Sequence, residues 1–431
     1  MNQVTSSEPF WGLLGPEQLV STRRVRTLGL GASIRRFNDL AVPGMGGVFF
    51  AKQICLAVLG VAVAQRLRET GRAVRNIETA NAIEALACWF AYDKNGWNPD
   101  RRLKGIFKLR FRNDVPTFAQ ARRASFYVTQ PMRMATVQPL LALGLVSGRS
   151  ERFNGYGLDA RGRGNDLIDS LCEEYGKLYY NQNLLERLTF WALGDAGAFS
   201  NMADPLSPIA PLRKSVRDLL WGFLVGGESP SAGRRRDALA WTAKCVESEQ
   251  APSLGRRPAQ ISPEHWKDIE AGALLFATRE AAVQLLLEVE GLMRERDPHR
   301  LPLGADLPRP LVRPMKILSD QAKRFLDYGY DPSASETATA FCRECLRPDQ
   351  ALPLLVKRDD RVLRLGEEAI IPGPAFVASG GMRASEDEEG DDSSKALGIL
   401  DIGDLSHRIR NLMMLQVDLR GNLSEFLRKS G

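Results

Sequence analysis

Apolar residues recur at steps of three and four through long stretches of this chain, and that spacing favours helices over strands. The pattern is clearest at 48–68, 77–92 and 262–296. The last stretch begins with Ser-Pro-Glu, where the serine suits the N-cap and the proline the first helical position. Residues 361–371 are instead typical of a strand or hairpin. We therefore predict a mainly α, multi-domain helical protein.

Composition excludes several classes of protein. The 431 residues are 44% hydrophobic and 26% charged, which is typical of globular domains. The longest apolar run, 54–64, is eleven residues, and a membrane-spanning helix needs about 20. Six cysteines are too few for a disulfide scaffold, and the first residues lack the pattern of a secretory signal. We therefore expect a cytoplasmic protein with no membrane contact.

The charge is unevenly distributed. Residues 1–165 hold 24 Lys and Arg against 11 Asp and Glu, a net charge of +13, and the remaining residues have a net charge of −7. A field of that sign attracts polyanions, either nucleic acid or an acidic protein surface. The alternative is a solvated basic face that keeps the domain soluble.

Residues 117–176 predict a unit with the order helix, turn, helix, hairpin, helix. The expected elements are a helix over 117–124, a second helix from Thr129 and Pro131 to Leu143 that Gly144 ends, strands at 145–146 and 153–158, and a third helix capped by Asp159. The run LLALGLV, followed by an arginine and by Y-G-L-D-A-R-G, resembles the winged helix-turn-helix of bacterial regulators of the multiple-antibiotic-resistance and related families. The resemblance covers about 60 residues, and Asp159 stands where those families usually have threonine.

A winged helix of this kind implies contact with duplex DNA. The start of a recognition helix meets base edges in the major groove, and arginines on the wing and flanks contact phosphates. The expected base-edge residues are Thr129, Gln130, Arg133, Thr136 and Gln138. The expected backbone contacts are Arg149 and Arg152 on the wing, a small β-hairpin, and Arg122, Arg123, Arg161 and Arg163 beside it. The alternative is a winged helix that binds only protein.

The end of the chain predicts an amphipathic helix behind an acidic linker. Six acids lie between Glu386 and Asp392 among glycines and serines, a composition typical of disorder. Beyond them, apolar residues alternate by three and four, and we expect this stripe to dock on a partner subunit or a second copy. The stripe comprises Ile402, Leu405, Ile409, Leu412, Leu419, Leu423 and Phe426. A cover supplied by the chain's own core is the alternative.

These observations divide the chain into six parts. They are 1–116, a basic helical N-terminal region; 117–176, the winged helix; 177–296, a helical domain; 297–377, a proline-interrupted region of helix and hairpin; 378–395, the acidic linker; and 396–431, the C-terminal amphipathic helix.

No local motif predicts catalysis or a cofactor. The sequence lacks a phosphate-binding GxxxxGK[ST] loop and a GxSxG nucleophile elbow. Its three histidines are far apart, and Cys342 and Cys345 form a lone pair where a zinc site needs two further ligands. We therefore expect no metal and no cofactor. An enzyme assembled from distant residues stays an alternative.

Together these patterns predict a non-enzymatic bacterial DNA-binding subunit of a larger assembly, cytoplasmic and associated with the nucleoid. DNA maintenance, mobile-element control and antiphage defence are the settings we consider. The alternative is an architectural subunit similar to the kleisins, whose winged helix binds protein partners of an ATPase complex.

Overall fold

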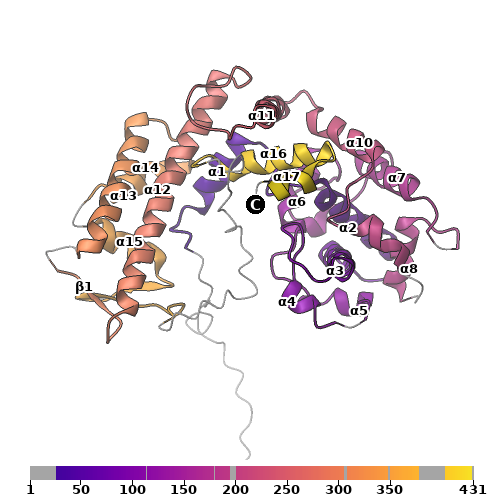
Figure 1. Cartoon of the computed structure of the whole chain (residues 1–431), viewed down its shortest axis with the longest axis horizontal. Coiled ribbons are helices and arrows are strands. Elements are labelled where there is room, and N and C mark those ends of the chain that lie inside the picture. Colours follow the sequence, from indigo (N-terminus) through magenta and orange to yellow (C-terminus); the bar gives the residue numbers. More distant parts are fainter. Residues whose placement is uncertain are drawn as a thin grey trace, which may run out of the picture. The chain divides into compact units, whose positions relative to one another are not determined.

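The chain is described by a computed structural model, and it is mainly helical with one small antiparallel sheet (Figure 1). The residues described are 26–112, 114–178, 180–194, 200–304, 308–347, 350–377 and 403–429. The predicted acidic linker, 378–395, lies outside them, as does Ile402. Two compact units are formed: a smaller one from 26–33 and 277–377, and a larger one from 34–276 and 403–429. The mainly α prediction is confirmed.

The larger unit is built from helices and short 3-10 turns. Its elements are α2 (Ala51–Glu69), α3 (Asn76–Lys94), α4 (Ile106–Leu109), α5 (Phe118–Ala121), α6 (Arg133–Ala142), η2 (Phe153–Gly155), α7 (Arg163–Tyr175), α8 (Leu184–Leu193), η3 (Ser200–Met202), α9 (Ala203–Leu206), α10 (Lys214–Val225), α11 (Pro230–Glu247), α16 (His407–Leu419) and α17 (Leu423–Lys429). Two helices contribute residues to both units, α1 (Gly31–Ala41) and α12 (Pro263–Arg294).

The smaller unit combines helices with a three-stranded sheet of order β1-β3-β2. Its elements are β1 (Leu301–Pro302), α13 (Arg309–Tyr328), η4 (Ala334–Glu336), α14 (Thr337–Cys345), α15 (Ala351–Asp359), β2 (Leu363–Leu365) and β3 (Ala369–Pro372). The hairpin predicted at 361–371 is confirmed as β2 and β3. Within the region predicted to be interrupted by prolines, α13 begins at Arg309. Pro310 lies in its first turn, where a missing N–H costs nothing.

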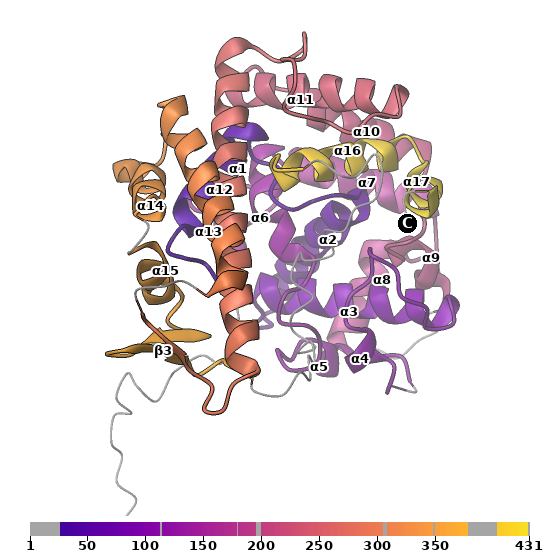
Figure 2. The ribbon, with the colours of Figure 1, turned by 60° about the vertical axis from the view of Figure 1, so that its left-hand side comes forward.

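Helix α2 is the centre of the larger unit. It is buried along nearly its whole length and contacts α3, α6, α7, α8 and α16 (Figure 2). The closest approach is to α3 at Gly60, where a Cβ atom would lie 2.6 Å from Ala80. Thr79 Oγ1 donates to the Gly60 carbonyl at 2.8 Å across the same contact. A helix that is apolar on all sides requires cover on all sides, and the surrounding helices supply it.

The C-terminal helix supplies part of that cover, which corrects the expectation of a partner-binding stripe. Leu405, Ile409, Leu412, Leu419 and Leu423 are buried in the core of the larger unit, and Phe426 is half-buried against it. Burial extends over both faces of α16, so the helix is not a one-sided stripe. A break follows at Gly421, which has a φ of +84° and separates α17. The apolar residues therefore complete the chain's own core.

The elements within 117–176 follow the predicted order with shorter lengths. Thr117 caps α5, and Gly144, with a φ of +68°, ends the α6 region as predicted. The expected strand pair is reduced to a single bridge between Ser147 and Gly157. Asp159 is not the cap of α7, which begins after Gly162. Its carboxylate instead accepts from Ser147 Oγ at 2.9 Å and is committed to the loop 147–157, which that single bridge closes and which we call the hairpin.

A buried ion-pair network holds the smaller unit together. Arg26 donates to Glu290 of α12 at 2.8 Å and to Asp359 of α15 at 3.2 Å, and all three side chains are almost fully buried. Burial raises the pKa of Asp359, although Arg26 opposes that shift. Arg294 also pairs with Glu290, so two arginines neutralise Glu290, whereas Arg26 is the cation that pairs with Asp359.

Leu412→Ala should lower the free energy of unfolding of the larger unit by about 2–5 kcal/mol, because it leaves a cavity in the core. The matched control is Met134→Ala, whose side chain on α6 of the same unit is 52% exposed, and we expect a change within about 0.5 kcal/mol. Urea denaturation followed by circular dichroism measures both. A Leu412→Ala protein as stable as wild type would show that α16 does not complete the core.

Arg26→Ala should destabilise the smaller unit by about 3–5 kcal/mol, because it leaves the buried carboxylate of Asp359 without its cation and removes one of the two arginines that pair with Glu290. Arg364→Ala is the control, since its pair with Asp360 is exposed on both sides and contributes at most about 1 kcal/mol. Thermal denaturation compares the two. Equal effects of the two substitutions would contradict a structural role for the buried network.

Candidate nucleic-acid interface

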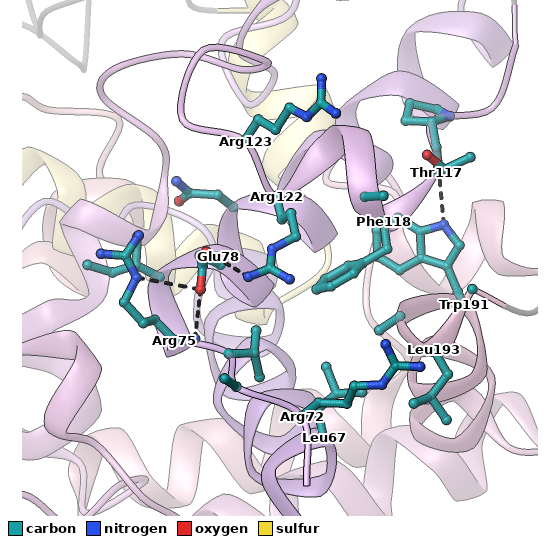
Figure 3. Close-up of a pocket in the computed structure, with 18 of the residues that line it drawn as sticks. Leu67, Arg72, Arg75, Glu78, Thr117, Phe118, Arg122, Arg123, Trp191 and Leu193 are labelled. Carbon is teal, nitrogen blue, oxygen red and sulfur yellow. Dashed lines mark hydrogen bonds and ion pairs between the residues drawn. The ribbon is translucent and has the colours of Figure 1, made fainter. Parts of the chain in front are cut away.

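A pocket of about 750 Å³ opens in the larger unit between the end of α2, the start of α3, α5 and the end of α8 (Figure 3). Its lining is apolar on one side and rich in arginine on the other. The main lining residues are Leu67, Arg72, Arg75, Glu78, Asn81, Phe118, Arg122, Arg123, Trp191 and Leu193. Pockets of this size with a few convergent polar groups are typical binding sites.

The apolar wall is fixed by two aromatic side chains from distant parts of the chain. Phe118 and Trp191 pack edge to face with ring centroids 5.3 Å apart. Trp191 Nε1 donates to the Pro116 carbonyl at 3.1 Å, which ties α8 to the segment before α5. Both rings are buried. The wall is therefore rigid, and it positions α5 with the arginine that follows.

The polar side of the pocket has four arginines and one carboxylate. Glu78 pairs with Arg122 at 2.9 Å and with Arg75 at 3.5 Å. Arg72 and Arg123 are exposed, and within the described residues neither side chain forms an ion pair. Arg75 is also largely exposed, with its side chain 69% accessible. The pocket therefore carries an excess of three positive charges, which favours an anionic ligand.

Glu78 also belongs to the start of α3. Its carboxylate accepts from the Arg75 backbone N–H at 2.8 Å, which is a capping-box contact. Burial alone would raise the pKa of Glu78, but the Arg122 side chain and the Arg75 N–H lower it below its usual value. Glu78 therefore stays ionised at neutral pH and holds Arg122 toward the pocket.

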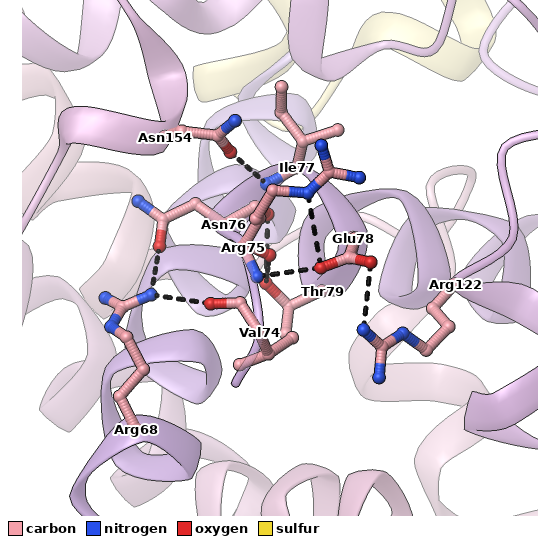
Figure 4. A network of polar contacts seen from close by, with 9 residues as sticks. All are labelled: Arg68, Val74, Arg75, Asn76, Ile77, Glu78, Thr79, Arg122 and Asn154. Carbon is pink, nitrogen blue, oxygen red and sulfur yellow. Dashed lines mark hydrogen bonds and ion pairs between the residues drawn. The ribbon is translucent and has the colours of Figure 1, made fainter. Parts of the chain in front are cut away.

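The hairpin after α6 is attached to the same helix start (Figure 4). Asn154 Oδ1 accepts from the Ile77 N–H at 3.0 Å. Asn76 Nδ2 donates to the carbonyls of Phe153 and Tyr156 at 2.9 and 2.8 Å, and its oxygen accepts from Arg68 at 2.9 Å. The hairpin is therefore fixed beside Arg75, at the rim of the pocket.

The arginines expected to contact phosphates are mostly exposed. Arg122 and Arg123 line the pocket, and Arg149, Arg152 and Arg161 project from the hairpin and the turn after it. Arg163 differs, because it donates to the Leu143 carbonyl at 3.0 Å and lies over the Phe223 ring, 5.2 Å from its centroid. Arg163 is therefore committed to packing between α6 and α10.

The residues expected to read base edges are placed differently. Thr136 is fully buried, which excludes it from a DNA contact. Arg133 donates to Asn81 and lies over the Phe153 ring, while Gln138 bonds with Asp39 and Arg408. Of the five, Thr129 alone is exposed, and Gln130 is half-buried.

A buried carboxylate explains this arrangement. Glu84 of α3 accepts from the backbone N–H groups of Met132 and Arg133, at 2.6 and 3.0 Å, and so caps the start of α6. Burial raises the pKa of Glu84, although these two N–H groups oppose the shift. The end of α6 that a recognition helix would present to a groove is therefore occupied by the protein itself.

The described part of the chain contains neither a cluster of metal-ligating side chains nor a helix that could cross a membrane. Among the described residues no group of three or more His, Cys, Asp or Glu side chains is placed to hold a metal ion. Cys342 and Cys345 are free and buried. No helix of the described part is both long and apolar enough to cross a bilayer.

Comparison with protein-family models, with curated proteins and with solved structures finds no match to this chain. The chemistry of the site is therefore argued from its residues. Arg72, Arg75 and Glu78 were not among the residues predicted from sequence, because they lie just before and at the start of α3, in a segment without a motif. Their Arg-x-x-Arg-x-x-Glu spacing at a helix start was the available signal.

Glu78→Gln should increase the affinity for pyrophosphate roughly threefold to tenfold, because it removes the one acid that neutralises the pocket arginines. Glutamine retains an acceptor for the Arg75 N–H, so the cap persists. Isothermal titration calorimetry measures the change, and Glu264→Gln, at an exposed site on α12, is the control. Unchanged affinity would contradict an anion site at this pocket.

The same variant tests the pKa shift. A pKa below its unfolded value means that ionised Glu78 stabilises the fold above the unfolded-state pKa, and that this contribution is lost as the pH falls through the folded-state pKa. Between about pH 7 and about pH 3, Glu78→Gln should therefore lose less stability than wild type. If the free energies of unfolding of the two proteins fell equally with pH over this range, the lowered pKa of Glu78 would be contradicted.

Proposed function

We propose that this chain is a non-enzymatic DNA-binding protein that contacts the phosphate backbone of duplex DNA through the pocket and the adjacent hairpin. The observation that carries the proposal is the set of four pocket arginines opposed by a single carboxylate. Guanidinium groups bind phosphate oxygens in a bidentate geometry, and such contacts dominate the affinity of proteins for DNA.

The position of the hairpin supports a DNA contact that extends beyond the pocket. Arg149 and Arg152 are exposed on it, and Asn154 fixes its base to the start of α3, which Arg75 precedes. In a winged helix the corresponding hairpin lies along the backbone of the duplex. We propose the same role here, so that the wing and the pocket together follow one stretch of phosphates.

The proposed contact is independent of DNA sequence. Base readout needs free side chains at the start of α6, and Glu84 occupies the backbone there while Arg133 and Gln138 bond within the protein. Phosphate contacts position a protein on DNA and carry no sequence information directly. The placement in a larger bacterial assembly, and the kleisin-like alternative, stay predictions from the sequence.

Arg72→Glu with Arg123→Glu is the sharpest test, because both side chains are exposed and neither forms an ion pair within the described residues. We expect at least a tenfold loss of duplex affinity. The slope of log affinity against log salt should fall by about 2, since each phosphate contact contributes about 0.9. Fluorescence anisotropy with a labelled duplex measures both quantities.

The control is Arg309→Glu with Arg313→Glu, a matched double charge reversal on the exposed start of α13. It changes the net charge equally and should leave most of the affinity. An equal loss in the control would assign binding to net charge rather than to the pocket. Absence of binding by wild type at about 50 mM salt, where phosphate contacts are strongest, would overturn the proposal.

A further inference from the structure

Two phenylalanines are exposed on a short segment of the larger unit, and neither is among the residues that line the pocket. Phe107 lies in α4 and is 52% exposed, and Phe111 follows it by four residues and is 77% exposed. Exposed large aromatic side chains are costly in a soluble fold, and clusters of them usually mark a binding surface. We call residues 104–112 the aromatic–arginine strip.

The backbone of the strip is firmly anchored. Gly105 has a φ of +80°, and a Cβ atom there would lie 2.7 Å from the Tyr127 ring. Leu109 is fully buried, Lys108 Nζ donates to the Tyr127 carbonyl at 3.1 Å, and Trp89 Nε1 donates to the Arg112 carbonyl at 3.2 Å. The fold therefore holds the turn in place and presents the two rings to solvent.

Cations alternate with the rings. The Arg110 guanidinium lies 5.9 Å from the centroid of the Phe111 ring, and that of Arg112 lies 4.9 Å from the centroid of Phe126. Both arginines are exposed, and within the described residues neither forms an ion pair. Lys104 and Lys108 add two further half-buried positive charges. The strip thus combines flat apolar faces with unneutralised guanidinium groups.

We propose that the aromatic–arginine strip binds single-stranded nucleic acid. Unpaired bases would stack on Phe107 and Phe111, and Arg110 and Arg112 would contact the adjacent phosphates. Aromatic platforms interleaved with basic residues are how proteins hold single strands without sequence preference. A duplex offers no free base faces to these rings, and a second copy of the same basic strip would be repelled. The inference does not depend on duplex binding at the pocket.

The test measures binding of a labelled oligothymidylate, about 20 nucleotides long, to the full chain by fluorescence anisotropy. Phe107→Leu with Phe111→Leu keeps apolar side chains at both sites but removes the aromatic faces. We expect at least a tenfold loss of oligothymidylate affinity and an unchanged affinity for duplex DNA. Phe111→Trp alone should retain binding, because a larger ring stacks at least as well. Tyr180→Ala, which removes another exposed aromatic ring of the larger unit, is the control and should bind as wild type does.

A second arm separates nucleic acid from a membrane surface. Phosphatidylserine vesicles are sedimented with wild type and with the double leucine variant. Vesicle binding without oligothymidylate binding would overturn the proposal, since leucine also supports insertion into a lipid surface. Oligothymidylate binding that survives both leucine substitutions would also overturn the proposal, because such binding would rest on charge alone and not on stacking. If Arg72→Glu with Arg123→Glu removes duplex binding while the leucine variant removes only single-strand binding, the two sites are distinct.

Discussion

Asp418 of α16 accepts a hydrogen bond from the Ala51 N–H at 2.8 Å and so caps the first turn of α2, the helix at the centre of the larger unit. Burial raises the pKa of this carboxyl, even though the Ala51 N–H and nearby cations oppose the shift. The contact joins α16 to α2, and α2 in turn supports α3, α6 and α8. The pocket lies between the end of α2, the start of α3, α5 and the end of α8. Its arginines are therefore positioned by a core that is completed by residues from both ends of the larger unit's sequence.

Much of the helical structure follows from local patterns. Helices α2, α3 and α12 arise where apolar spacing, caps and prolines agree, and Thr117 and Gly144 mark boundaries as local chemistry predicts. Local sequence patterns do not determine which surface covers an apolar stripe. The residues of α16 fit a partner, a second copy or the chain's own core equally well, and only the fold shows that the core buries them.

Part of the candidate site could likewise be predicted from local sequence, and part of it could not. Arg122 and Arg123 were predicted from sequence as phosphate contacts, and they line the pocket. The wall that faces them depends on Trp191 meeting Pro116, 75 residues away, which no spacing predicts. The role of Glu84 was equally hidden, because a carboxylate within a helical pattern is usually solvated, whereas this one caps α6 from inside. The sequence therefore could not show that most of the side chains predicted to read bases are held by contacts within the protein.

The bond between Ala51 and Asp418 also has a consequence for synthesis of the protein, because it joins residues 367 positions apart. At ribosomal rates of about 5–20 residues per second, α2 emerges roughly 20–70 s before its capping carboxylate. During that interval α2, which is buried along nearly its whole length in the folded protein, lacks part of its cover. A nascent chain of this kind has to be shielded, either by loose collapse of the helices already made or by a chaperone, until translation reaches the last helices.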